Sequence, residues 1–189
     1  MQLDLIKKEL RKVIHLDDEM FQDFSKLFRT VRLEKGEFWI KNGRRSNYIG
    51  FVNGGILRQY VQQEGEEFIQ NFFVTGDFMG LFARPNKQRN ESLRIQAIEV
   101  CELLVMPYER LQCLIGFSKN LEQFSNHWQT EKYTELDQMY VRLLAQTPEQ
   151  RYRWLLSHKP EIINQVPQYY IAQYLGIKPE TLSRIKKRA

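Results

Sequence analysis

Cysteine is scarce in this chain, since Cys101 and Cys113 are the only two among 189 residues. Two cysteines at this separation form neither a disulfide framework nor the spacing of metal ligands. We therefore expect each of them to be a small, buried hydrophobic side chain.

Histidine is also scarce, and the common catalytic motifs are missing. His15, His127 and His158 lie outside residues 28–107, the segment whose pattern predicts strands. A metalloenzyme of the cupin type needs two or more histidines and a carboxylate inside its barrel, so this class is disfavoured. The sequence has no Gly-x-Ser-x-Gly elbow, phosphate-binding loop, dinucleotide-binding fingerprint or paired-cysteine motif. We expect a protein that is not an enzyme and holds no metal ion.

Long apolar runs are absent as well. No stretch approaches the roughly 20 apolar residues that a membrane-spanning helix needs. The first residues, MQLDLIKKELRKVI, contain no uninterrupted apolar core of signal-peptide length. We expect a cytoplasmic protein with no membrane partner. Its composition, 42% hydrophobic and 13% aromatic, can supply a core, and its length allows one mid-sized domain plus a small one.

The segment Val166–Arg188, VPQYYIAQYLGIKPETLSRIKKR, has the pattern of a helix-turn-helix. Pro167 suits the first position of a helix, where its missing N–H would be unpaired in any case. Ile171, Ala172 and Leu175 then share one face at helical spacing, and this face is expected to be buried. Ala172 is small enough to let a second helix cross nearby.

The turn and the second helix follow directly. Gly176 allows the left-handed conformation that ends a helix, and Ile177 is expected to fill the corner between the two helices. Pro179 opens the second helix, which runs to about Lys187. Its inward residues are Leu182 and Ile185, and its outward residues are Lys178, Glu180, Thr181, Ser183, Arg184 and Lys187. An outward face this polar and basic suits the major groove of DNA.

The positive charge of the chain is concentrated in the same region. From Arg142 to the end there are nine Lys or Arg and three Asp or Glu, a balance of +6, so the preceding residues carry −1 of the total of +5. Neutralising DNA phosphates requires such a local excess. Because two short helices joined by glycine can also serve protein contacts, a ligand-sensing or scaffold module remains the alternative.

Residues 28–107 contain short runs of aromatic and β-branched residues separated by glycines, which predicts an all-β segment. Roughly eight strands fit, enough for a jelly-roll or β-roll that closes around its own interior and can hold a ligand there. Two hairpins are expected. They are Asn53-Gly54 between Tyr48–Val52 and Ile56–Val61, and Glu64-Gly65 between that second strand and Phe68–Phe73.

Helical patterns flank this segment. Residues 3–27 predict two short helices, the second capped by Asp17 or Asp18, and Tyr108–Ile115 predicts a third. A long helix is expected over about Ser118–Ala145. Its apolar stripe is broad and interrupted, so it is not a strict heptad seam. The stripe consists of Leu121, Phe124, Trp128, Leu136, Met139, Tyr140, Leu143 and Leu144.

A helix this long needs partners on more than one side. We expect it to pack on its own β-roll and on a second copy of the chain, while a single helix lying on its own domain is the alternative. The expected dimer interface consists of Leu121, Phe124, Trp128, Leu136, Met139 and Leu143. Thr147 and Pro148 then end the long helix and open the next one. The predicted domains are 1–117, 118–146 for the long helix, and 147–189.

The order of these parts resembles the Crp/Fnr family of bacterial transcription regulators, and in particular its Bacteroidetes branch. In the second half the resemblance rests on Arg151-Tyr152, Leu155, Pro160, Pro167-Gln168, Ile171-Ala172, Tyr174-Leu175-Gly176-Ile177 and Glu180-Thr181-Leu182-Ser183-Arg184. In the first half it rests on Lys35-Gly36-Glu37, Asn47-Tyr48-Ile49, Asn53-Gly54-Gly55, Gly76-Asp77-Phe78 and Cys101-Glu102-Leu103-Leu104.

The resemblance implies an α+β fold with an N-terminal antiparallel β-roll of the cyclic-nucleotide-binding type, a long dimerisation helix and a small C-terminal helix-turn-helix domain. It also implies a homodimer that presents two recognition helices to a pseudo-palindromic operator in double-stranded DNA and contacts RNA polymerase. The implied function is transcription regulation, with an unidentified small effector in the β-roll.

The β-roll departs from the members that bind cyclic AMP. Their Gly-Glu pair for the ribose reads Gly80-Leu81 here, and their Arg-Ser pair for the phosphate reads Glu91-Ser92. A carboxylate repels an anion, so the usual cyclic-nucleotide site is effectively absent and cyclic AMP is not expected to bind. The cysteines of iron–sulfur oxygen sensors and a haem signature are also missing, so no cofactor can be named. The residues expected around an effector are Phe72, Gly80, Leu81, Glu91, Ser92 and Arg94.

The recognition helix departs from the family at one position. Pro179 stands where the best-known members have their first base-reading arginine, whereas Glu180 and Arg184 match the following Glu and the second Arg. Glu180 can accept from a cytosine amino group and Arg184 can donate two bonds to a guanine, so a changed operator sequence is expected. The expected DNA-binding residues are Gln168, Lys178, Glu180, Thr181, Ser183, Arg184, Lys187 and Arg188, with Lys186 as a further phosphate contact.

Overall fold

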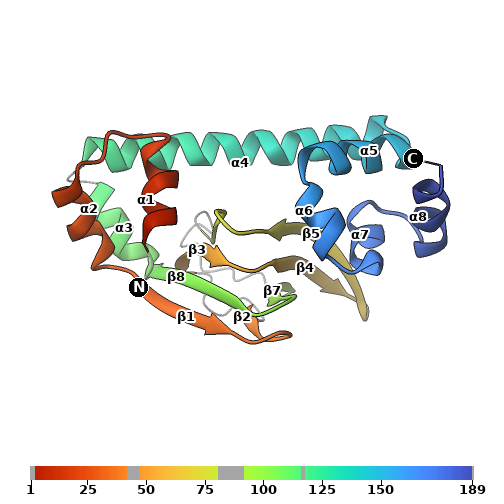
Figure 1. Ribbon diagram of the computed structural model, residues 1–189, viewed down its shortest axis with the longest axis horizontal. Coiled ribbons are helices and arrows are strands. Elements are labelled where there is room, and N and C mark those ends of the chain that lie inside the picture. Colours follow the sequence, from red (N-terminus) through yellow and green to blue (C-terminus); the bar gives the residue numbers. More distant parts are fainter. Residues whose placement is uncertain (1–2, 42–46, 81–91, 116–117, 189) are drawn as a thin grey trace.

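The computed structural model describes residues 3–41, 47–80, 92–115 and 118–188 (Figure 1). Within these ranges eight strands form two antiparallel sheets, and helices pack on part of the outer face of each sheet. The strands are β1 (Arg29–Leu33), β2 (Phe38–Ile40), β3 (Tyr48–Gly54), β4 (Leu57–Gln63), β5 (Glu66–Phe73), β6 (Phe78–Met79), β7 (Leu93–Ala97) and β8 (Cys101–Pro107). The helices are α1 (Asp4–Arg11), α2 (Asp18–Ser25), α3 (Tyr108–Ile115), α4 (Lys119–Ala145), α5 (Pro148–His158), α6 (Pro160–Gln165), α7 (Gln168–Tyr174) and α8 (Pro179–Lys186). The predicted α+β fold is confirmed.

The two sheets stack face to face, with strand orders β1-β8-β3-β6 and β2-β7-β4-β5. The alternation of side chains along a strand divides their contacts between two layers. In β3, Val52 points into the core between the sheets, while Phe51 points outward to the core under the helices. The core between the sheets contains Leu33, Trp39, Ile40, Leu57, Phe73, Met79, Ile95, Ala97, Leu103 and Val105, among others.

One predicted hairpin is confirmed and the other is wrong. β4 and β5 pair across Glu64 and Gly65, whose φ angles of 53° and 86° suit a two-residue turn of type I′. Asn53-Gly54 does not close a hairpin, because β3 pairs with β6 and β8, whereas β4 pairs with β5 and β7.

The segment after β3 carries the chain from one sheet to the other. Its turn is made by Gly55, at φ +94°, and a Cβ there would meet the Val100 carbonyl oxygen at 2.6 Å. The side-chain amide of Asn53 instead donates to Glu102, in the neighbouring strand β8. A short Asn-Gly signal cannot tell a turn within a sheet from a crossing between sheets, because both need glycine.

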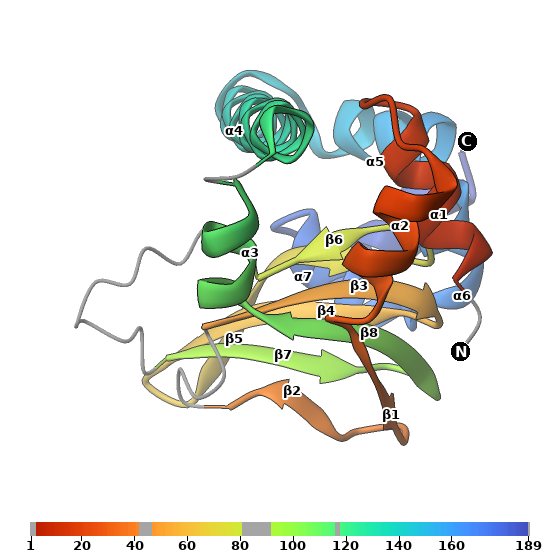
Figure 2. The same cartoon turned by 90° about the vertical axis from the view of Figure 1, so that its left-hand side faces the viewer.

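The long helix α4 runs along one side of the molecule, with α1–α3 at its first end and α5–α8 at its second (Figure 1). Figure 2 shows it end-on above the strands. Ser118 caps it by accepting from the Leu121 N–H at 3.4 Å, and Asp17 caps α2 by accepting from Met20, as predicted. Phe124 packs its ring 5.1 Å from that of Phe78 in β6, so the first turns of α4 belong to the core of the β-roll.

The C-terminal helices share a hydrophobic core with the outer face of the second sheet. This core joins Ile56, Tyr60, Ile69, Phe72 and Ile98 of the β-roll to Tyr152, Leu155, Ile162, Ile163, Val166, Ile171, Ala172, Leu175, Leu182 and Ile185. The helix-turn-helix is therefore packed on the β-roll of its own chain. Thr147 and Gln150 form a capping box at the start of α5, which confirms the predicted break after α4.

The two cysteines differ, contrary to the expectation that both are buried. Cys101 has no exposed surface, and its thiol donates to the Ile56 carbonyl oxygen at 3.3 Å. Burial raises the pKa of Cys101 to about 11, so the unreactive thiol form dominates at neutral pH. Cys113 is exposed on α3, so the expectation is wrong for this residue.

The two thiols should therefore react at different rates with a thiol reagent. With a disulfide reagent at mildly alkaline pH, the native protein should react quickly at Cys113 and at least about tenfold more slowly at Cys101. Both should react at once in guanidinium chloride. Cys113→Ser should remove the fast phase, and two fast thiols in the native protein would contradict the burial of Cys101.

Candidate nucleic-acid interface

The predicted helix-turn-helix forms from α7 and α8. Gly176 lies between them at φ +65°, and the Ile177 N–H donates back to the Ala172 carbonyl oxygen at 3.0 Å. Ala172 and Leu182 are 0% and 1% exposed where the helices cross. Pro179 is the first residue of α8, as expected, whereas Pro167 is the residue just before α7 rather than its first helical residue.

The outer face of α8 carries the predicted DNA-binding residues. Exposed on it and beside it are Lys178, Glu180, Ser183, Arg184, Lys186, Lys187 and Arg188, while Thr181 is half-buried. Gln168 is exposed at the start of α7. Arg184 Nη2 donates to Thr181 Oγ1 at 3.3 Å. Within the described ranges, none of the basic side chains of α8 forms a salt bridge with a carboxylate, so their charge is available to a polyanion.

A buried arginine of the β-roll holds α7 in place. Arg58 in β4 is 5% exposed, and its guanidinium lies between the rings of Tyr60 and Tyr170, 4.2 and 4.1 Å from their centroids. Two of its nitrogens donate to the carboxylate of Glu67 in β5. Nε and Nη2 donate to Gln96 Oε1 in β7 at 2.9 and 2.7 Å. We call this group the Arg58 cluster.

A second aromatic contact strengthens the attachment of α7. The rings of Phe72 in β5 and Tyr174 in α7 lie 5.3 Å apart at 60°. Burial raises the pKa values of both Tyr170 and Tyr174, so both phenols stay protonated at neutral pH. The first helix of the helix-turn-helix is thus fixed to the sheet at both ends.

Arg151 in α5 binds the C-terminal ends of α4 and α7. Its Nε and Nη2 donate to the Leu175 carbonyl oxygen at 3.1 and 2.9 Å, and Nη1 donates to the Gln146 carbonyl oxygen at 2.7 Å. Both carbonyls belong to helix ends, where four carbonyls lack partners within the helix. Arg151 therefore connects the end of α4 with the end of α7.

The comparisons with known proteins agree with this architecture. The cyclic nucleotide-binding domain family matches residues 30–116. The fumarate and nitrate reduction regulatory protein of Yersinia pestis is 26% identical over 172 residues, which cover 85% of this chain and 68% of that protein. The structure of FixK2 from Bradyrhizobium japonicum has a TM-score of 0.71 at 18% identity, over 85% of this chain and 83% of that one. A transcriptional regulator from Eubacterium rectale, assigned to the Crp/Fnr family, has a TM-score of 0.69 at 18% identity, over 92% of this chain and 83% of that one.

The domain model, the sequence relatives and the fold together support membership of the Crp/Fnr family. The sequence relatives are regulators, so the expectation that this protein is not an enzyme is confirmed. In the part of the chain that the structure describes, no helix has the length and apolar character needed to cross a membrane. No group of three or more His, Cys, Asp or Glu that could hold a metal ion is found among the same residues.

Those residues expected around an effector that the structure describes do not gather inside the β-roll. Phe72 faces α7, and Arg94, which is paired with Tyr60, lies on the same outer face of the sheet. Gly80 has no room for a side chain, since a Cβ would meet the Tyr48 carbonyl oxygen at 2.4 Å. Ser92 precedes β7 and is half-buried. Leu81 and Glu91 lie outside the described residues.

The expected dimer residues divide into two groups. Leu121 and Phe124 are 4% and 5% exposed, so these two are covered within their own chain, and Trp128 is half-buried beside them. Met139 is half-buried against the C-terminal helices. Leu136 and Leu143 are 64% and 49% exposed. The apolar stripe thus serves the β-roll at its first end and is uncovered at its second.

The Arg58 cluster can be tested by the free energy of unfolding. Arg58→Ala should lower it by about 3 kcal/mol, because Glu67 loses its partner and two tyrosine rings lose their cation. Arg153→Ala is the matched control, since it removes an exposed pair with Glu149 and should cost about 0–1 kcal/mol. If urea denaturation gave the same loss of unfolding free energy for both variants, the Arg58 cluster would contribute no more to stability than an exposed ion pair.

Proposed function

We propose that this Crp/Fnr protein binds double-stranded DNA as a homodimer, with α8 of each copy in the major groove of one half-site. The observation that carries the proposal is the outer face of α8, where cationic side chains are exposed and have no carboxylate partners among the described residues. DNA-binding transcription regulation is the function of the family, and the relatives are regulators.

The residues of α8 divide into two proposed roles. Arg184 and Glu180 read base edges, since an arginine can donate two bonds to guanine and a glutamate can accept from cytosine. The hydrogen bond from Arg184 to the Thr181 hydroxyl helps to orient the guanidinium. The phosphate contacts come from Lys178, Lys186, Lys187 and Arg188, with Ser183 and Gln168 at the edge of the contact surface. Phosphate contacts position the protein and base contacts give specificity.

The proposed dimer surface is the uncovered half of α4. Tyr133, Leu136, Tyr140 and Leu143 follow one another at intervals of three, four and three residues, the spacing of a two-helix seam. They are 74%, 64%, 60% and 49% exposed, and Leu144 beside them is 69% exposed. Because so much contiguous apolar surface is rare on a monomer, a second copy is the simplest cover for it. Two copies would present two α8 helices to half-sites about one helical turn apart.

The remaining parts of the proposal follow from the family. The domain division at residues 118 and 147, contact with RNA polymerase, a cytoplasmic location and control by a small effector are all proposed on this basis. The competing function is a scaffold whose helix-turn-helix mediates protein contacts. Selection of bound fragments from random DNA distinguishes the two, because a regulator enriches an inverted repeat and a scaffold enriches nothing.

Base and phosphate contacts should give different signatures on the selected operator. Arg184→Ala should cost about 1–3 kcal/mol of binding free energy and relax the preference at one operator position. Lys187→Ala should weaken operator and random DNA alike and lower the slope of affinity against salt by about one. If Arg184→Ala bound both DNAs with the parent affinities over the whole salt series, α8 would not be the reading helix.

The dimer can be tested with a matched pair of variants on α4. Leu136→Glu places a charge in the proposed seam and should convert the dimer to a monomer in sedimentation velocity. Gln138→Glu adds the same charge at an exposed position off the seam and should leave the dimer intact. A parent protein that sediments as a monomer at micromolar concentration, with or without operator DNA, would contradict the proposed surface.

A further inference from the structure

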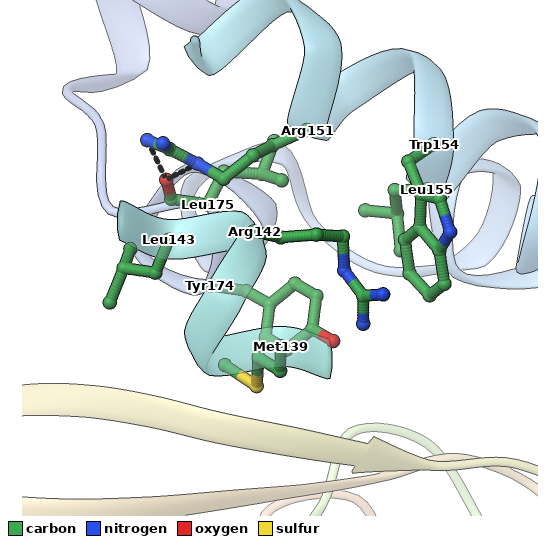
Figure 3. A pocket seen from close by; sticks show the side chains of 8 residues that line it. All are labelled: Met139, Arg142, Leu143, Arg151, Trp154, Leu155, Tyr174 and Leu175. Atoms are coloured by element: carbon green, nitrogen blue, oxygen red, sulfur yellow. Dashed lines mark hydrogen bonds between the residues drawn. The ribbon is translucent and has the colours of Figure 1, made fainter. Parts of the chain in front are cut away.

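A hollow lies where the end of α4, the helix α5 and the end of α7 meet (Figure 3). It contains about 340 Å³ of space not filled by atoms, part of it open to solvent. Met139 and Leu143 of α4, Leu155 of α5 and Leu175 after α7 give it mainly apolar walls. None of the predicted DNA contacts and none of the predicted effector residues belongs to it, whereas Met139 and Leu143 are also among the expected dimer residues, so the hollow borders the proposed dimer surface.

The two arginines that line the hollow differ in their partners. Arg151 is fully engaged with the carbonyl oxygens at the ends of α4 and α7. The guanidinium of Arg142 lies over the ring of Trp154, with its carbon 3.7 Å from the ring centroid (Figure 3). Its side chain has no hydrogen-bond acceptor and no carboxylate partner among the described residues. A nearby acid on the same helix, Glu135, is paired with Lys132 at 2.8 Å.

An arginine in such surroundings favours an anion of a particular kind. A guanidinium offers two parallel N–H groups to a carboxylate, and stacking on an indole ring leaves those groups at its edge free. Contact with the apolar walls makes the binding of a hydrophobic body more favourable, and burial of a second charge there would make binding less favourable. Tyr174 adds a phenol that burial keeps protonated, which gives a further donor beside the guanidinium.

We propose that this hollow, lined by Arg142, Trp154 and Tyr174, is a binding site for a small monocarboxylate with an aromatic body. The carboxylate of the ligand accepts hydrogen bonds from the guanidinium of Arg142, and the aromatic ring of the ligand lies against Met139, Leu143 and Leu155. The site is separate from the interior of the β-roll. Its walls come from α4, α5 and α7, so an occupant bridges the proposed dimerisation helix and the helix-turn-helix.

The expected consequence for regulation rests on the proposed function. Because α8 is packed on α7, a ligand that fixes α7 against α4 also fixes the direction of α8 relative to the proposed dimer axis. It would change operator affinity without touching DNA. Binding itself is measured on the protein without DNA, so failure of the ligand site and failure of the proposed function can be told apart.

Calorimetry with phenylacetate as the probe tests the site. We expect saturable binding with a dissociation constant of about 0.1–1 mM, given the few non-hydrogen atoms of the probe. Acetate has the charge without the ring and 2-phenylethanol has the ring without the charge, and both should bind at least about tenfold more weakly. Arg142→Gln should weaken phenylacetate at least about tenfold, whereas Arg153→Gln, an exposed arginine on α5 outside the hollow, should change nothing.

A second variant tests the hollow without removing the charge of Arg142. Met139→Trp fills the hollow and keeps the guanidinium, so it should also abolish binding of phenylacetate. Thermal unfolding of each variant checks that it is folded. The proposal is overturned if the parent protein does not bind phenylacetate at about 10 mM. It is equally overturned if 2-phenylethanol binds as well as phenylacetate, or if the folded Arg142→Gln and Met139→Trp variants bind like the parent.

Discussion

The buried guanidinium of Arg58 is the constraint on which the arrangement of the two halves of this protein depends. An arginine that is 5% exposed must have its charge and its N–H groups satisfied, or its burial costs several kcal/mol. Glu67 and Gln96 supply acceptors from two neighbouring strands, but the open face of the guanidinium needs the ring of Tyr170. When α7 docks, this ring replaces water over a guanidinium whose N–H groups already have partners within the β-roll.

The long helix α4 also contacts both halves of the chain, the β-roll at its first end and the C-terminal helices at its second. Its first turns face the β-roll, where Phe124 completes a core with Phe78, and its last turns meet α5 and α7 through Arg142 and Met139. Between these ends the side of the helix that faces away from the chain is apolar and uncovered. A helix fixed at both ends within one chain offers a partner a rigid surface, which lowers the entropic cost of association.

Local signals in the sequence were sufficient wherever the cause of the structure is local. Gly176, Thr147 and the Glu64-Gly65 turn were predictable, because each position needs a particular backbone conformation or cap that few residues provide. Contacts between distant segments were not predictable in this way. Arg58 lies in the predicted strand Ile56–Val61, and no residue near it in the sequence indicates that α7 will cover it. Leu121 and Leu136 belong to one stripe, and only the fold shows that one is covered and the other is not.

The outcome for the expected effector residues follows from the same difference. The register of a strand decides on which face each residue lies, and here it puts Arg94 and Phe72 on the outer face of the sheet. On that outer side they meet the helix-turn-helix rather than a closed interior. The sheet β2-β7-β4-β5 therefore has the filled core of the β-roll on one face and the support of α7 on the other. The strands that carry Arg58 and Phe72 thus contact α7 directly, through the rings of Tyr170 and Tyr174.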